Sequence, residues 1–571
     1  MTMNISGGGE HTPAKETAAL AVLLFFAVLI VSLPALVPGH DLVGHDILCH
    51  LNRIEGIREG LLSGQFPVRL SPNQIGGYGM PTGIFYPDLF LYVPAVLYLC
   101  GVPLVASWHV FLVMVNVLTA AASWWAFSKY TRSQRTGAIA TLFYLVFLYR
   151  LVDMYARAAE GEMLAMAFLP AALLSVWMTL RRDTSYWPAV TLFLTGILQS
   201  HIITGLVIVV AAVVLAAVSY PRLRVPGVRW AIAKAAGMTF LLNIWFYAPL
   251  LYVHTHMDYM MKDSVQGSIA AAIRPLKSMD YYMGRTMLYL LAVYIIYLLC
   301  SRQRRSRVPL QFWGLMLLAA AFIGLTVFPA PWQAFGGLVA VLQFPFRLAM
   351  FPAVLIPLAL AISLSHVRRL SVIVLCACIC LGGNFFWLVG NTYRTLPDHF
   401  KTPQDHILAP KPVPMIMLEA APSQVEQYMA WGNIFYTDYA DSAVDREVRR
   451  PGSFFQRKVR DRARDLHPAD RITDVRRQGA DFVVTYQAGA EEHVQLPVFW
   501  YIGYDAEGTA GDYQLQKDGD GQVSIVLPPE AGTVHVWYRG LPWFRVTDAV
   551  SLVSLLGFCI ILYRVGRKEI A

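Results

Sequence analysis

Residues 38–60 read PGHDLVGHDILCHLNRIEGIREG and directly follow the first hydrophobic segment of the chain. Titratable side chains are costly next to lipid, so seven Asp, His and Arg residues at this place need an explanation. Ile47, Leu51 and Ile54 recur within the stretch at the spacing of a helix. The pattern predicts an amphipathic helix that lies on the membrane surface.

Three polar residues of this helix share one face. Asp46, His50 and Arg53 stand at positions i, i+4 and i+7, which places an acid, an imidazole and a guanidinium in one stripe beside the apolar face. One interpretation is a reaction site at the membrane surface. The other is a solvated interfacial helix with incidental charges, and spacing alone does not separate the two.

The composition is that of a polytopic membrane protein. The chain has 571 residues, of which 56% are hydrophobic and 15% charged, and its mean hydropathy is +0.48. Such a chain cannot have the surface of a soluble protein. The net charge of +9 comes from short basic clusters between apolar runs, a pattern typical of cytoplasmic loops. We therefore expect no nucleic-acid partner.

Apolar runs of near-spanning length predict about twelve transmembrane helices. All basic clusters fall on the cytoplasmic side if both termini are inside and residues 88–100 form an interfacial or re-entrant helix that does not cross. The first segment is expected to be a signal-anchor helix and not a cleaved signal peptide. The predicted spans are 17–37, 103–127, 135–150, 162–180, 186–200, 202–219, 229–252, 284–300, 308–328, 347–365, 370–389 and 548–564.

This topology divides the chain into three parts. Residues 1–390 form a transmembrane domain whose first outer loop covers 38–102, and residues 548–571 form the last helix and a cytoplasmic tail. Between them, residues 391–547 form an extracytoplasmic domain. Alternating stretches such as QVSIVLP and GTVHVWYRG, separated by Gly and Asp turns, predict a small β-sandwich there.

Further ionisable residues gather in the other outer loops. The stretch YARAAEGEML contributes Arg157, Glu160 and Glu162, QSHIITG contributes His201, and LQFPFRLAM contributes Arg347. Singly, each has an ordinary structural explanation, such as a first-turn helix charge or a headgroup anchor. Together, they lie at one depth on one side, which favours a site at the outer leaflet.

Several stretches carry a resemblance to a known family. The segment from GHDILCHLNRIEG to GIFYPDLFLY, together with RAAEGEMLA, SHIIT and LQFPFR, resembles the YfhO-like bacterial membrane proteins. More distantly, these stretches are similar to the GT-C superfamily of polyprenyl-phosphate-sugar glycosyltransferases. FYTDYADSA and VFWYIGYDA extend the resemblance into the C-terminal domain.

The resemblance implies a GT-C-like fold and a glycosyltransferase that faces the outside of a bacterial cytoplasmic (inner) membrane. Its donor would be a sugar on a polyprenyl phosphate, and its acceptor a cell-envelope glycan or a lipid-linked molecule. A catalytic acid is expected in the first outer loop, where Asp46 matches best and Asp41 is the second candidate. A carboxylate there can act as general base on the acceptor hydroxyl.

The hypothesis assigns the remaining residues to binding of the phosphate, a metal ion or the sugars. The leaving lipid phosphate needs fixed cations, for which Arg347, Arg157 and Arg53 are the candidates, with Lys277 also available. The chain has no clear DxD metal motif, and a divalent cation at His45, Asp46 and His50 stays an alternative. Tyr86 and Trp332 could also stack on a sugar. The predicted sugar or acceptor contacts are His45, His50, Tyr78, Glu160, Glu162 and His201.

Two other classes of function compete with the enzyme. A flippase or transporter for lipid-linked sugars should carry polar groups near the membrane midplane and often shows internal repeats, neither of which the sequence displays. A non-catalytic scaffold would use the C-terminal domain to bind envelope glycans. Such a scaffold would not need the acid and arginine residues of the outer loops.

Overall fold

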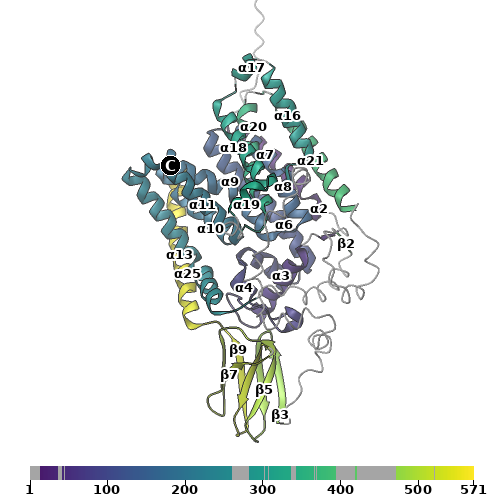
Figure 1. Ribbon diagram of the computed structural model, residues 1–571, viewed down its shortest axis with the longest axis vertical. Helices are drawn as coiled ribbons and strands as arrows, with labels where there is room; N and C mark the ends of the chain where they lie inside the picture. Colours follow the sequence, from purple (N-terminus) through teal and green to yellow (C-terminus); the bar gives the residue numbers. More distant parts are fainter. Residues whose placement is uncertain are drawn as a thin grey trace, which may run out of the picture.

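A helical bundle forms most of the chain, and a small β-domain lies at one end of its long axis, opposite α17 (Arg302–Ser306) (Figure 1). The computed structural model describes residues 13–36, 41–43, 46–259, 282–300, 302–306, 308–335, 342–365, 367, 369–393, 418–420, 471–519 and 521–570.

Each of the twelve predicted spans coincides with helical structure. In the described part of the chain, eight helices are long and apolar enough to cross a membrane, or nine if one bent pair counts as a single span. Three of the twelve are shorter, with 12, 17 and 15 residues: α10 (Trp187–Leu198), α11 (Ile202–Val218) and α16 (Arg285–Leu299). The eight long ones include α1 (Pro13–Val31), α6 (Leu104–Thr131), α9 (Glu160–Arg181), α13 (Pro226–His256), α18 (Leu310–Val327), α20 (Met350–Leu364, with η7, Pro345–Ala349, before it), α21 (Leu370–Tyr393) and α25 (Pro542–Ile570).

The centre of the bundle is formed by α9 and α20, whose apolar windows are each 83% buried. Helix α6 packs on α7 (Gln134–Leu145) and α9, whereas α20 packs on α7 and α18. The last helix, α25, lies along α13 at the side of the bundle and is only 17% buried in its window (Figure 1). A helix with so much exposed apolar surface is suited to contact lipid.

The predicted helix of the first loop is present as α3 (Ile47–Leu62), but it does not lie on a surface. Ile47, Leu51 and Ile54 are buried as expected, and Arg53 on the polar side is also buried. Two glycines explain the difference. A Cβ at Gly56 would lie 2.6 Å from that of Ser71, and one at Gly60 would lie 2.4 Å from a Val68 methyl. The absence of these side chains lets the following loop cover the helix.

Residues 88–100, predicted to be interfacial or re-entrant, contain the short elements η2 (Leu89–Leu91) and α5 (Tyr92–Leu99). Eleven helical residues rise only about 16 Å, roughly half of the ~30 Å of a bilayer core. This length is too short for a span.

Helix α7 ends at Leu145 and continues, after a bend of 52°, as α8 (Leu148–Leu151) and the π-helical turn η3 (Val152–Ala156). Such a break frees backbone carbonyls that need new donors. Arg150 supplies them: its Nε and Nη2 donate to the Leu145 carbonyl at 3.2 and 2.9 Å, and its Nη1 donates to Asn116 Oδ1 at 2.7 Å. The bend turns the chain so that Asp153 and Arg157 lie beside the first loop.

The C-terminal domain is the predicted β-sandwich, described over residues 471–538. One antiparallel sheet has the order β3-β4-β9-β6 and the other the order β5-β8-β7. In β9, Val534, Val536 and Tyr538 are buried and alternate with partly exposed residues, as a sandwich requires. The strands are β3 (Ile472–Gln478), β4 (Asp481–Tyr486), β5 (Glu492–Phe499), β6 (Tyr504–Gly508), β7 (Leu515–Lys517), β8 (Gln522–Leu527) and β9 (Gly532–Tyr538).

Most of residues 391–470, including FYTDYADSA, lies outside the described residues; the exceptions are the end of α21 and β2 (Leu418–Ala420). Strand β2 pairs in antiparallel fashion with β1 (Asp41–Val43), with Asp41 opposite Ala420. The predicted fold class, a polytopic α-helical membrane protein with short helices in its first loop and a small β-sandwich domain, is confirmed.

The β-domain contacts the first loop through backbone carbonyls of the loop. The Phe499 N–H donates to the Tyr78 carbonyl at 2.9 Å, and the Tyr501 hydroxyl donates to the Gly79 carbonyl at 3.0 Å. The guanidinium of Arg477 donates to the Gly77 carbonyl. These bonds place the β-domain directly on the loop that also carries α3.

Candidate functional site

The motif Glu160-Gly161-Glu162, which opens α9, organises the candidate site. Residues two apart on a helix point in nearly opposite directions, so the two carboxylates serve two neighbouring groups of side chains. Gly161 between them allows close packing, because a Cβ there would lie 2.6 Å from both the Tyr86 hydroxyl and the Ser200 carbonyl. Both glutamates are buried, each 1% exposed.

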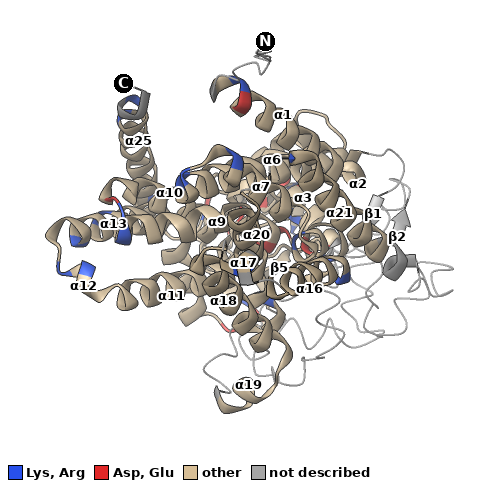
Figure 2. Ribbon diagram, turned by 90° about the horizontal axis from the view of Figure 1, so that it is seen from above, with Lys and Arg blue, Asp and Glu red and all other residues tan. Residues whose placement is uncertain are grey.

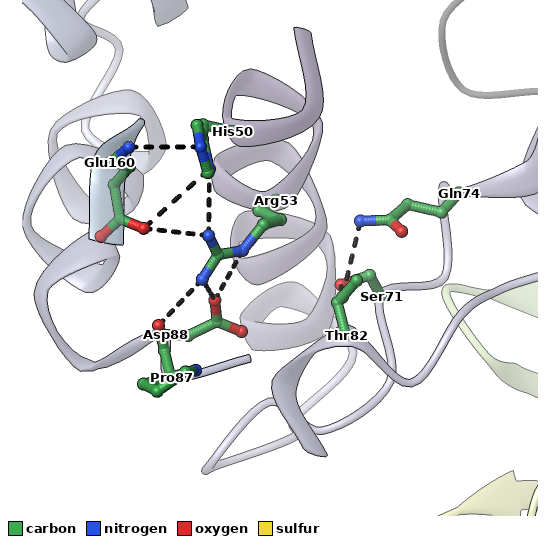
Figure 3. A network of polar contacts seen from close by, with 8 residues as sticks. All are labelled: His50, Arg53, Ser71, Gln74, Thr82, Pro87, Asp88 and Glu160. Carbon is green, nitrogen blue, oxygen red and sulfur yellow. Dashed lines mark hydrogen bonds and ion pairs between the residues drawn. The ribbon is translucent and has the colours of Figure 1, made fainter. Parts of the chain in front are cut away.

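On one side, Glu160 joins the Arg53 cluster, which we define as His50, Arg53, Tyr86, Asp88 and Glu160. Figure 3 shows these residues except Tyr86. The Arg53 Nε donates to Asp88 at 2.9 Å, and its Nη1 donates to Glu160 at 3.0 Å. Its Nη2 donates to the Pro87 carbonyl at 2.8 Å and also to Asp88. The guanidinium lies 4.0 Å from the centre of the Tyr86 ring.

His50 completes this cluster. Its ring stacks on Trp108 with 6.1 Å between ring centres, and its Nδ1 lies 3.0 Å from Arg53 Nη1. Its Nε2 lies 3.4 Å from the Glu160 backbone N–H. A neutral imidazole has one acceptor nitrogen, so it can accept from only one of these two donors. Burial, and next the charge of Arg53, hold the pKa of His50 well below its usual range, so the ring is neutral.

On the other side of α9, Glu162 joins the Arg157 cluster, which we define as Tyr149, Asp153, Arg157, Glu162 and Arg347. Arg157 Nη1 donates to Glu162 at 2.9 Å and also to Asp153. Arg347 Nε lies 3.6 Å from the same Glu162 oxygen, and the Tyr149 hydroxyl donates to the other one. Two guanidinium groups therefore converge on one carboxylate.

Parts of these groups have no hydrogen-bond partner among the described residues. Arg347 Nε and Asp153 Oδ2 are buried without one. The Nη2 groups of Arg157 and Arg347 also have no hydrogen-bond partner among the described residues. In contrast, every N–H of Arg53 faces an acceptor. Buried polar groups are normally paired, so open donors at such a place are suited to an anionic ligand.

The backbone beside both arginines is strained. Ala158 follows Arg157 and has φ +51°, and Gln343, whose side chain accepts from Arg347 Nη1 at 2.9 Å, has φ +61°. Left-handed conformations of residues other than glycine cost about 1–3 kcal/mol and cluster at functional sites. The strained backbone therefore supports a functional role for the positions of the Arg157 and Arg347 guanidinium groups.

Asp46 and His201 lie between the two clusters. Asp46 precedes α3 and is half-buried; its backbone N–H donates to the Arg157 carbonyl at 2.9 Å, and its charge acts on Arg157 and Tyr86. His201 caps α11, where its Nδ1 accepts from the Thr204 N–H at 3.3 Å. Burial, followed by the charge of Arg347, lowers the pKa of His201 to about 3.

The site has no surplus of positive charge. Three arginines, Arg53, Arg157 and Arg347, face five carboxylates, and Asp88 and Glu160 are bound to Arg53. Burial raises the pKa of Asp88, an effect that Arg53 partly offsets. An anion would therefore have to bind through direct hydrogen bonds from the open donors and not through a general positive potential.

The structure brings together most of the residues predicted for the site: Asp46, His50, Arg53, Arg157, Glu160, Glu162, His201 and Arg347, together with Tyr86. Tyr78 lies elsewhere, because it is buried against Phe499 between the first loop and the β-domain. Trp332 is also buried, and its Nε1 donates to the Leu325 carbonyl at 2.7 Å. His45, Lys277 and the side chain of Asp41 lie outside the described residues.

Three residues of the two clusters were missed from the sequence: Asp88, Asp153 and Tyr149. Asp88 follows Pro87 and comes directly before a mostly apolar stretch. That stretch predicts a helix and gives no sign of a site residue. Tyr149 lies within the predicted span 135–150, whereas Asp153 lies just after it, in the predicted outer loop. A charge at the end of a predicted span is the signal that could have identified Asp153. No group of three His, Cys, Asp or Glu side chains suited to a metal occurs among the described residues.

Replacing Arg53 with methionine is expected to lower the free energy of unfolding by about 3–5 kcal/mol, because two buried carboxylates lose their counter-charge. Arg58→Met on the same helix is the control; Arg58 is partly exposed, and we expect less than about 1 kcal/mol there. Thermal unfolding in detergent measures both. Equal effects of the two substitutions would contradict a central role for Arg53.

Stability should fall as the pH decreases below about 6.5, in part because of His201. Its pKa is about 3 in the folded protein and near 6.5 when unfolded, so between these values the unfolded state binds more protons. Each such group contributes up to about 1.4 kcal/mol per pH unit. The titratable groups that face His201 are Arg347, Glu162, Arg157, Tyr86 and His50.

His201→Asn tests this expectation, because asparagine retains a capping side chain for α11 but does not titrate. We expect the melting temperature of the variant to depend less on pH than that of the unmodified protein between pH 7.5 and 5. Identical pH profiles would show that His201 is not buried as a neutral ring.

Comparisons with known proteins reveal only distant likenesses. No family model matches the sequence, and no curated protein matches it. Among solved structures, the chain is similar to ArnT from Cupriavidus metallidurans bound to undecaprenyl phosphate, with 14% identity, a TM-score of 0.35, and coverage of 73% of this chain and 70% of that chain.

The chain is also similar to the archaeal oligosaccharyltransferase AglB from Archaeoglobus fulgidus, in complex with an inhibitory peptide and a dolichol-phosphate. The identity is 12% and the TM-score 0.37, and the match covers 70% of this chain and 60% of that chain. Both TM-scores are below 0.5, so no property of either protein is assigned to this chain.

Proposed function

We propose that the protein is a GT-C-type glycosyltransferase that moves a sugar from a polyprenyl phosphate to a cell-envelope glycan or a lipid-linked acceptor. The observation that carries this proposal is the convergence of Arg157 and Arg347 on Glu162, with open N–H donors, beside the half-buried Asp46. The resemblance of the first loop to YfhO-like proteins agrees with it. The site would face the outside of a bacterial cytoplasmic membrane.

In the proposed reaction, the acceptor hydroxyl oxygen attacks the anomeric carbon of the donor sugar, and the bond from that carbon to the phosphate oxygen breaks. Asp46 takes the hydroxyl proton, as a positioned general base. The phosphate leaves with increased negative charge, which the free N–H groups of Arg157 and Arg347 stabilise. Arg53 would be a positioning residue, because its donors already hold Asp88, Glu160 and His50 in place.

The direct test is turnover with defined donors. Purified protein in liposomes is supplied with individual polyprenyl-phosphate sugars and an envelope glycan fraction, and the release of free polyprenyl phosphate is measured. We expect release with one donor class and none without the acceptor. Binding of polyprenyl phosphate without turnover of any donor would support phosphate recognition but contradict the transferase activity.

One observation favours a second function. The broken helix formed by α7 and α8, with the buried Arg150 at the break, resembles the discontinuous helices of transporters. A flippase would move a fluorescent lipid-linked sugar across a liposome membrane without any acceptor. Such movement, with no sugar transferred, would replace the glycosyltransferase proposal with this one.

A further inference from the structure

The turn between α11 and α13, together with the end of α9, carries basic residues without acidic partners. No Asp or Glu occurs in the sequence between Asp183 and Asp258. Figure 2 shows basic residues along the short helix α12 (Tyr220–Leu223) and the adjoining start of α13. None of these side chains forms an ion pair with a carboxylate among the described residues. We define the α12 patch as the five exposed residues Arg181, Arg222, Arg224, Arg229 and Lys234.

Two arginines of the patch are held by neutral oxygen atoms. Arg222 Nη2 donates to the Arg181 carbonyl at 2.9 Å, and Arg181 Nε donates to the Ser219 hydroxyl at 2.9 Å. Each guanidinium thus binds the chain beside the other arginine, which fixes two like charges in one small region. Neutral acceptors orient a guanidinium but leave its charge uncompensated, so this arrangement favours the binding of an anion.

The other three cations of the patch are accessible to a ligand. Arg224 lies 5.2 Å from the centre of the Tyr220 ring, and Lys234 lies 5.1 Å from that of the Trp187 ring. Arg229 is exposed in the first turn of α13. The helix dipole disfavours a cation in the first turn, so the stability of α13 does not explain this arginine. A bound anion would offset the repulsion between Arg229, Arg224 and the positive end of the helix.

An exposed apolar stripe on α11 leads to the patch. Val210, Val214 and Val218 follow one another at helical spacing, and each is more than half exposed. Val218 is the last residue of α11, directly before the turn. From residue 206 to residue 218 the helix rises about 18 Å, which is similar to half of the ~30 Å hydrocarbon core of a bilayer. Trp230, 70% exposed beside Arg229, is a residue typical of the headgroup level.

The valine stripe and the patch together decide the kind of anion. A soluble phosphate ester or a nucleic acid would use the charges of the patch but not the exposed valines. An anionic phospholipid uses both, because its phosphate lies at the headgroup level and its acyl chains extend along the apolar surface of a spanning helix.

We propose that the α12 patch binds the phosphate of an anionic phospholipid, with Arg224 and Arg229 as the phosphate contacts and an acyl chain along the valines of α11. The lipid would hold the turn between α11 and α13 against the end of α9. Arg181 ends α9 and Glu160 begins it, so about 33 Å of helix separate the patch from the candidate active site. The inference therefore does not depend on the proposed glycosyltransferase activity.

The test uses phosphatidylglycerol as the probe and native mass spectrometry of the full-length protein to measure the dissociation constant of the first bound lipid. In Arg224→Gln/Arg229→Gln, we expect binding at least about tenfold weaker, because two charges that attract the headgroup are lost. The control Arg305→Gln/Arg369→Gln removes two exposed charges in α17 and directly before α21. We expect less than about a twofold change there. Both variants should melt at the temperature of the original protein in a neutral detergent.

Further measurements identify the source of the phosphate and the role of charge. The charge-conserving Arg224→Lys/Arg229→Lys variant should bind phosphatidylglycerol within about threefold of the original protein. Glycerol 3-phosphate at millimolar concentration should not displace the lipid; displacement would mean that a soluble phosphate ester is the ligand and would overturn the lipid assignment. Equal weakening in the Arg224/Arg229 and Arg305/Arg369 variants would also overturn it, because general surface charge would then explain the binding. Unchanged affinity in Arg224→Gln/Arg229→Gln would exclude the α12 patch as the binding site.

Discussion

Asp46→Asn is expected to reduce sugar transfer at least about 100-fold while the protein stays folded. The substitution is nearly isosteric, and the backbone N–H of residue 46, which donates to the Arg157 carbonyl at 2.9 Å, is retained. Asparagine cannot accept the proton of the acceptor hydroxyl. The loss should therefore appear in the turnover number, with little change in the affinity for donor.

Two further variants serve as a control and as a test of the alternative base. Glu59→Gln, on the same helix but partly exposed and paired with Arg58, should keep full activity. Asp41→Asn tests the second candidate from the sequence: if it is inactive and Asp46→Asn is active, the base is Asp41. Full activity in both Asp41→Asn and Asp46→Asn would show that neither aspartate of the first loop is the catalytic base.

Substitution of Arg347 should give the second large effect, with Arg347→Ala about 10²–10³-fold less active and Arg347→Lys less impaired. Lysine keeps the charge but loses the planar two-point contact with phosphate. The fold should survive, because Glu162 keeps its bonds to Arg157 and Tyr149 when Arg347 is removed. The same variants should bind undecaprenyl phosphate more weakly.

Arg58→Ala is the matched control for this series, since it removes an arginine of the first loop that lies outside both clusters. Unfolding of Arg347→Ala in detergent would make Arg347 a structural anchor. Unchanged affinity for undecaprenyl phosphate in a folded but inactive variant would place its role with the acceptor or in the transition state alone.

The sequence predicts helices and strands well because apolar periodicity determines them. Twelve apolar runs correspond to helical segments, and alternating residues such as Val534 and Val536 mark the β-sandwich. The burial of α3 could not be predicted in the same way. It depends on Gly56 and Gly60 facing Ser71 and Val68, a contact between segments that no local pattern encodes.

The same limit applies to the site. The ionisable residues of the outer loops were identified because charge near an apolar run is rare. Their grouping into two clusters depends on Gly161, which brings α9 close to Tyr86, and on the bend after Leu145, which carries Asp153 toward Arg157. A bend stabilised by Arg150 has no signature in hydropathy, so the sequence does not predict that Asp153, which follows the predicted span 135–150, lies against Arg157.

The hydrogen bonds between the β-domain and the first loop bear on how this protein can change its specificity. Phe499, Tyr501 and Arg477 each bind a carbonyl of Tyr78, Gly79 or Gly77, and every residue of a chain has such a carbonyl. Side chains elsewhere in the loop can therefore be exchanged while these bonds persist. Exposed residues of the first loop, outside the Arg53 cluster and the contacts of Gly56 and Gly60, can be varied in a library, and the β-domain would still hold each variant in the same register.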